Sequence, residues 1–155
     1  MAISDHGALV TKKAVWGLAF YKAAICGGYV MASGVHYAEF TRTGEYGLVG
    51  VARGGFEVAA GELPSNSAAG WAYDMYDGVL RHGGGGSAWA GQEGCPSGAT
   101  VGLRLDLTAG TLEVFRDGRR LGVMAEGLAG PLCWHAELMY AGDVVRIQGK
   151  PPPAL

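Results

Sequence analysis

The sequence predicts an all-β domain, built as a sandwich or a barrel of antiparallel strands. Short runs of apolar, β-branched and aromatic residues recur along the chain, and turn residues separate them. Glycine is unusually frequent, at 28 of 155 residues, and most glycines stand between the apolar runs, where they indicate turns. One stretch, residues 98–123, also shows the strict alternation that is typical of strands with one buried face.

The expected strands follow the apolar runs in chain order. Only residues 14–25 could support a helix on propensity, and Gly17, the aromatic residues and the pair Gly27-Gly28 argue against one. The complete set of expected strands is 8–12, 14–20, 28–32, 35–41, 46–52, 71–74, 100–107, 111–116, 119–123, 132–139 and 143–148.

The clearest element is the hairpin within residues 98–123. Large apolar residues occupy every second position from 101 to 107, and Thr108-Ala109-Gly110 then turns the chain into a second strand at 111–116. Asp117-Gly118 is a dipeptide that tight hairpin turns prefer, because glycine accepts a positive φ without steric cost.

Two long segments do not have a strand pattern. Residues 53–70 and 77–97 are rich in Gly, Ser, Asn and Pro, and both exceed the usual length of a hairpin loop. Long loops on a rigid β scaffold are commonly functional, because the scaffold presents them without burying their polar backbone. The sequence therefore places the function in these segments.

Length and charge indicate a single soluble domain. Residues 1–149 are expected to form the domain, and residues 150–155, a proline-rich stretch, form a linker-like tail. A net charge of −2 and a pI of about 6.0, with no run of basic residues, argue against binding to nucleic acid. The chain has neither an apolar run long enough to cross a bilayer nor a signal-peptide pattern, so a cytoplasmic or otherwise intracellular location is expected.

Cysteine usage fits the same location. Cys26, Cys95 and Cys133 lie far apart, form no C-x-x-C pair and have no histidine at zinc-site spacing. Three reduced thiols are the expected state, which is typical of a reducing compartment.

Signatures of enzymes, cofactors and metals are absent from the sequence. The chain lacks G-x-S-x-G, H-E-x-x-H and a phosphate loop, and the run Gly83 to Gly86 lacks the spacing of a dinucleotide motif. Glu39 and Asp106 are interpreted as structural carboxylates that close turns or accept backbone N–H groups. A calcium site is the alternative interpretation of the scattered loop acids, which are Glu57, Glu62, Asp74, Asp77 and Glu93.

Several motifs resemble those of one known family. Residues 33–40, Ser-Gly-Val-His-Tyr-Ala-Glu-Phe, are similar to the motif G-x-H-Y-x-E-[V/F] of SPRY domains. The family's V-G-V-A, S-W-G-[WY], V-G-x-x-L-D, G-T-L, [ND]-G and L-G-V motifs follow in the correct order. Their counterparts here, together with the segment that closes the family's core, are residues 48–52, 70–73, 101–106, 110–112, 117–118, 121–123 and 128–132.

The resemblance covers residues 5 to 149 and implies both a fold and a role. The implied fold is a bent, concanavalin-like jelly-roll sandwich of two antiparallel sheets with long loops at one end. The implied role is non-catalytic protein–protein recognition through those loops, in some members as a substrate receptor or scaffold. The chain departs from the family pattern at Ala72, Val114 and Ala141.

Aromatic and arginine side chains in or beside the long loops are the candidate binding residues, because such side chains dominate binding hot spots. Tyr140 corresponds by the resemblance to an aromatic residue of the family's binding surface, and Arg53 stands where the family's binding loops begin. Trp71 and Tyr73 are expected in the core instead, because they alternate within a strand. The candidate partner-binding residues are Arg53, Phe56, Tyr76, Arg81, Trp89 and Tyr140.

The leading hypothesis is a module that binds a peptide or protein, without cofactor or metal and as a monomer when isolated. Two alternatives stay open: a lectin-like carbohydrate binder that uses aromatic platforms, and a structural module of a larger assembly. A large contiguous apolar face on the isolated domain would favour the structural module.

Overall fold

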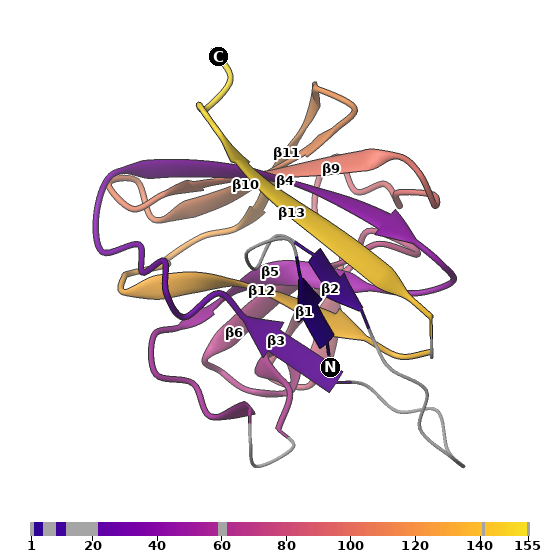
Figure 1. Cartoon of the computed structure of the whole chain (residues 1–155). Coiled ribbons are helices and arrows are strands. Elements are labelled where there is room, and N and C mark those ends of the chain that lie inside the picture. The colour runs from indigo at the N-terminus through magenta and orange to yellow at the C-terminus, as the bar shows by residue number, and fades with distance from the viewer. Residues whose placement is uncertain (1, 5–8, 12–21, 59–61, 141, 155) are drawn as a thin grey trace.

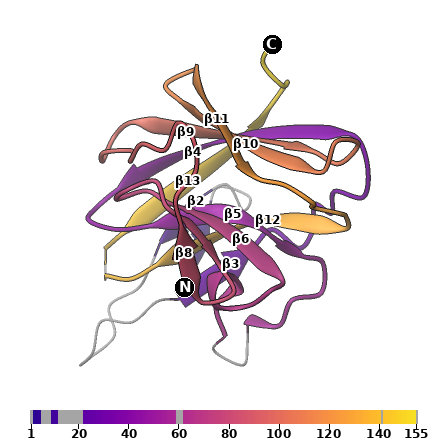
Figure 2. The ribbon, with the colours of Figure 1, turned by 180° about the vertical axis from the view of Figure 1, so that it is seen from behind.

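The computed structural model describes residues 2–4, 9–11, 22–58, 62–140 and 142–154, and these form two antiparallel sheets. The sheets lie one above the other in both views of the ribbon (Figure 1 and Figure 2). The seven-stranded sheet runs in the order β1 (Ala2–Ser4), β2 (Leu9–Thr11), β13 (Val144–Lys150), β4 (Val35–Thr43), β9 (Thr100–Asp106), β10 (Thr111–Arg116) and β11 (Arg119–Ala125). The six-stranded sheet runs in the order β3 (Lys22–Ile25), β12 (Leu132–Leu138), β5 (Leu48–Arg53), β6 (Gly70–Asp74), β7 (Leu80–His82) and β8 (Gly85–Ser87). The prediction of an all-β sandwich is confirmed.

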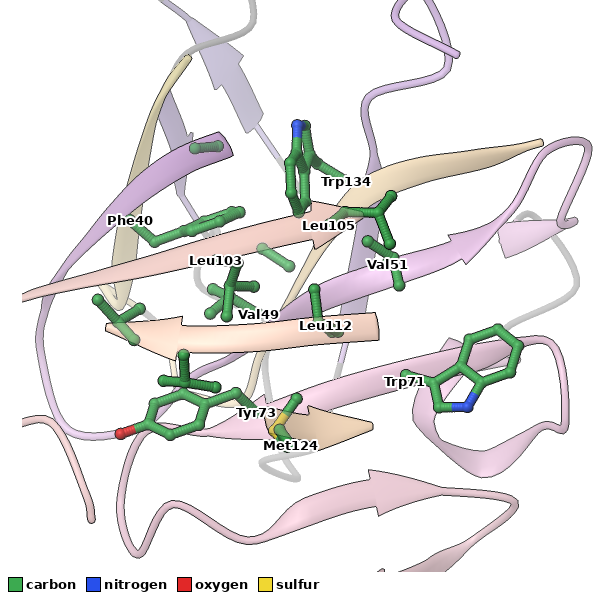
Figure 3. Close-up of a cluster of buried hydrophobic side chains, with 14 of the residues drawn as sticks. Phe40, Val49, Val51, Trp71, Tyr73, Leu103, Leu105, Leu112, Met124 and Trp134 are labelled. Atoms are coloured by element: carbon green, nitrogen blue, oxygen red, sulfur yellow. The ribbon is translucent and has the colours of Figure 1, made fainter. Parts of the chain in front are cut away.

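The core lies between the facing sides of the two sheets. Figure 3 shows Phe40, Leu103 and Leu105 of one sheet and Trp134 of the other among the buried side chains. The Phe40 and Trp134 rings meet edge to face, with centroids 5.8 Å apart. Each large apolar side chain buried in this way stabilises the fold by about 1.5–3 kcal/mol.

The hairpin around residues 98–123 forms as the sequence predicts. Strands β9 and β10 pair from Thr111 opposite Asp106 to Arg116 opposite Val101. Asp106 accepts hydrogen bonds from the backbone N–H groups of Thr108 and Ala109, both at 2.9 Å, so its carboxylate closes the turn. At the next turn Asp117 and Gly118 both have positive φ, of 48° and 82°.

Four strand expectations differ from the structure. Residues 28–32 were expected to form a strand, but they turn after β3, and only Met31 makes an isolated bridge, to Leu132. Strand β3 lies where no strand was expected, and the loop expected at 77–97 contains β7 and the glycine-rich β8, which are too short to show an alternating pattern. Strand β13 extends to Lys150, into the expected tail, and the expected strand at 14–20 lies outside the described residues.

The outer face of the six-stranded sheet is covered in part by residues 53–70. A short 3-10 helix, η3 (Pro64–Asn66), folds over this face and buries Pro64 and Ser65. The η3 part of the expected binding loop 53–70 therefore packs on the sheet.

Candidate functional site

The strand register places the expected binding residues at opposite ends of the six-stranded sheet. Arg53 ends β5 and pairs with Leu132, where β12 begins. Phe56 follows Arg53 in a turn closed by a hydrogen bond from Phe56 N–H to the Arg53 carbonyl (3.1 Å). Tyr76 and Tyr140 follow the ends of β6 and β12 at the other end of the sheet. The six residues thus do not form one surface.

The end that carries Tyr76 presents exposed aromatic side chains. The Tyr76 side chain is 73% exposed and stacks on Tyr46, with ring centroids 6.2 Å apart and an interplanar angle of 17°. Tyr140 is 38% exposed. Asp143 accepts hydrogen bonds from the backbone N–H groups of Glu45 (2.9 Å) and Tyr140 (3.0 Å), so it holds the turns that carry Tyr46 and Tyr140 together. We call Tyr46, Tyr76 and Tyr140 the tyrosine rim.

A pocket of about 410 Å³ opens on the outer face of the six-stranded sheet beside Tyr46. Residues of both long segments line it, namely Leu63, Ser65 and Asn66 of 53–70 and Arg81, Gly84 and Gly85 of 77–97. We call it the outer-face pocket. Its lining residues are Tyr46, Leu48, Leu63, Ser65, Asn66, Asp74, Arg81, Gly84, Gly85 and Glu137.

Asp74 forms one side of this pocket and is fully buried. Its carboxylate accepts hydrogen bonds from the Tyr46 hydroxyl (2.7 Å), the Arg81 Nε–H (3.2 Å) and the Tyr76 backbone N–H (3.0 Å). Burial lowers the pKa of Arg81, but the hydrogen bond and the charge of Asp74 outweigh it, and the net pKa is raised. Arg81 therefore stays charged and neutralises Asp74. Arg81 is one of the two arginines that the sequence predicts to bind a partner, and here it pairs within the chain.

Glu137 forms the other side of the pocket, and sequence reasoning missed it. The carboxylate accepts hydrogen bonds from the Ser65 hydroxyl (2.6 Å) and the Ser65 backbone N–H (3.3 Å), and its Oε2 lies 2.9 Å from His135 Nε2. His135 is also buried, and its Nδ1 has no hydrogen-bond partner among the described residues. Glu137 thus links Ser65 to His135, one on each carboxylate oxygen. The three residues hold η3 on the sheet.

The Trp89 side chain packs within the chain and is partly buried. Its indole N–H donates a hydrogen bond to the Gly78 carbonyl (2.7 Å), and its ring packs against the core. Gln92 donates to the Asp77 carbonyl (3.0 Å) and braces the same loop. Trp71 and Tyr73 are buried, as the alternation within their strand predicts.

The loop acids weighed as calcium ligands do not gather. Among the described residues no group of three or more His, Cys, Asp or Glu side chains could hold a metal ion. Glu93 instead pairs with Arg119 (2.9 Å) and Arg116 (3.3 Å), and the hydrogen bond from Arg119 lowers its pKa. Gly83 and Gly84 form the turn between β7 and β8.

A wider apolar groove of about 850 Å³ lies where Trp134 and Phe40 approach Ile147 and Tyr29. Two polar side chains on its lining are already engaged within the chain. His36 bonds to the Ser33 carbonyl (2.8 Å) and to Tyr29, and Lys150 pairs with Glu39 at 2.6 Å. No helix among the described residues is long and apolar enough to span a membrane.

The three cysteines are free thiols whose chemistry can be tested directly. Burial raises the pKa of Cys26, Cys95 and Cys133, and Cys133 raises that of Cys26 further. Because the thiolate is the nucleophile, we expect all three to react slowly with Ellman's reagent at neutral pH and fast after unfolding in guanidinium chloride. The rate in the folded protein should rise with pH, and one fast cysteine at neutral pH would contradict the burial described here.

Comparison with known proteins supports the fold. The sequence matches no protein-family model and no curated protein. The structure is similar to the SPRY domain of human HERC1, with a TM-score of 0.75 and 18% identity over 94% of this chain and 90% of that one. A further human SPRY domain aligns with a TM-score of 0.69 and 17% identity over 91% of both chains. The TRIM65 PSpry domain aligns at 0.72 and 15% identity, over 95% of this chain and 84% of that one.

Proposed function

We propose that this chain, which has the fold of SPRY domains, is a non-catalytic module that binds a protein or peptide through the outer-face pocket and the tyrosine rim. SPRY domains typically serve as protein-interaction modules. The observation that carries the proposal is the pocket formed by both long segments, next to a tyrosine that is 73% exposed. Exposed tyrosines beside a concave polar site are typical of binding hot spots.

The chemistry of the pocket supports binding rather than catalysis. Asp74 is neutralised by Arg81, and Glu137 is surrounded by the donors of Ser65 and His135. Fixed, satisfied polar groups of this kind orient a ligand without transferring a proton or forming a bond to it. The free thiols also fit the proposal of an intracellular location, and we propose that the isolated domain is a monomer.

A paired capture experiment tests the site. Wild type and the double variant Tyr76→Ala/Tyr140→Ala are used to recover partners from cell lysate, and each recovered partner is titrated by calorimetry. Both side chains are exposed, so the fold should be retained, and each truncation should weaken binding about tenfold or more.

Tyr29→Ala is the matched control, because Tyr29 is 54% exposed and lies near Met31, which bridges Leu132 at the other end of the sheet. The control should recover the same partners as wild type. If the double variant also recovers them all with unchanged affinity, the ligand does not use the tyrosine rim.

A further inference from the structure

Arg53 places a guanidinium group over Trp71 at the end of the sheet opposite the tyrosine rim. Its backbone N–H donates to the Ala69 carbonyl (2.8 Å), and the residue pairs with Leu132 across the sheet. The guanidinium carbon lies 5.5 Å from the ring centroid of Trp71, within the range of a cation–π contact. The residue is exposed.

Trp71 is itself held in place on its neighbouring strand. Its ring stacks on His82, with centroids 4.8 Å apart and an interplanar angle of 10°. His82 Nδ1 lies 2.7 Å from the Gly70 carbonyl, which fixes the imidazole. Figure 3 shows Trp71 at the far end of β6 from Tyr73. We call Arg53, Trp71 and His82 the arginine stack.

Arg53 differs from the other basic side chains of the described ranges. Arg81, Arg104, Arg116, Arg119, Arg120 and Lys150 each pair with a carboxylate. Arg42 is buried and donates to the carbonyls of Gly44 and Cys95, and Lys22 and Arg146 are also engaged. The guanidinium of Arg53 alone donates no hydrogen bond to any residue that the structure describes.

We infer that the arginine stack is a second docking point, which binds a carboxylate side chain of an acidic partner segment. A guanidinium offers a planar fork of donors that matches a carboxylate in bidentate geometry. Stacking on Trp71 restrains the arginine before the ligand arrives, so less side-chain entropy is lost on binding. Phe56, half-buried in the adjoining turn, supplies apolar surface for the stem of the bound side chain. This docking point does not depend on the outer-face pocket, which lies elsewhere on the sheet.

The test is an NMR titration of the whole chain with two blocked amino acids, acetyl-glutamate amide and acetyl-glutamine amide. The reporters are the Nε–H signal of Arg53 and the indole N–H signal of Trp71. We expect a saturable shift of both signals with the glutamate probe and at least about tenfold weaker binding of the glutamine probe. Arg53→Gln should abolish the shift of Trp71, and Arg53→Lys should weaken it because the planar fork is lost.

Arg119 provides the internal control. Its side chain is 62% exposed, but its guanidinium already pairs with Glu93. If the Arg119 Nε–H signal shifts with the glutamate probe as strongly as that of Arg53, the inference that Arg53 is a specific carboxylate-binding residue is wrong. Inorganic phosphate, titrated at matched ionic strength, separates the two anion sources. Binding of phosphate at about tenfold lower concentration than the glutamate probe would overturn the carboxylate assignment in favour of a phosphoryl ligand.

Discussion

Glu137→Leu is expected to lower the free energy of unfolding by about 3–5 kcal/mol, because it leaves the buried groups that Glu137 bonds without their acceptor. Glu137 is fully buried and satisfies the Ser65 backbone N–H, the Ser65 hydroxyl and His135 Nε2. Leucine has a similar volume but accepts no hydrogen bond. Each donor that stays buried without a partner then costs about 1–3 kcal/mol.

Urea unfolding followed by tryptophan fluorescence measures this effect. Glu57→Leu is the matched control. Glu57 is exposed, so this variant replaces the same side chain by leucine without removing a buried contact. Glu137→Gln should lie between the two, since its amide oxygen can still accept from Ser65. A loss for Glu137→Leu no larger than that for Glu57→Leu would show that η3 is not held by this carboxylate.

Local patterns predicted most of the strands, and the failures have local causes. Strand β9 was predictable because large apolar residues alternate along it, and β10 because β-branched and aromatic residues follow the Thr108-Ala109-Gly110 turn. Strand β3 reads Lys-Ala-Ala-Ile, and only its last residue is a strong strand former. Strands β7 and β8 have three residues each, and β8 contains only glycine and serine, so tertiary pairing rather than propensity makes them extended.

The candidate site was harder to predict because it depends on which strands become neighbours. Tyr140 and Arg53 end up apart because β12 runs antiparallel to β5, so the residue that follows one strand lies opposite the start of the other. Glu137 lies within a strand that is buried along its whole length. Its partner Ser65 is 72 positions away in the sequence, and nothing in the spacing links the two residues.

Gly50→Ala is expected to prevent correct pairing of β5 with β6 and to cost at least about 3 kcal/mol, the upper range for overpacking a core. A Cβ atom at position 50 would overlap the backbone carbonyl oxygen of Trp71 and lie 2.8 Å from the Ala72 Cα. Both are main-chain atoms of a central strand, so no side-chain rotation relieves the contact. The strands would have to separate, and hydrogen bonds between Val51 and Trp71 would be strained.

Gly149→Ala separates this clash from the general effect of replacing a glycine in a strand. Gly149 lies in β13, opposite Ala38, and a Cβ atom there would meet no atom within 4 Å. The variant should be neutral or slightly more stable than wild type, because alanine loses less backbone entropy on folding. Urea unfolding of the two variants provides the comparison, with amide hydrogen exchange of β5 and β6 to localise the damage. Equal stability of both variants would mean that β6 can move away from β5 without loss, and the arginine stack on Trp71 would then be a mobile feature rather than a fixed one.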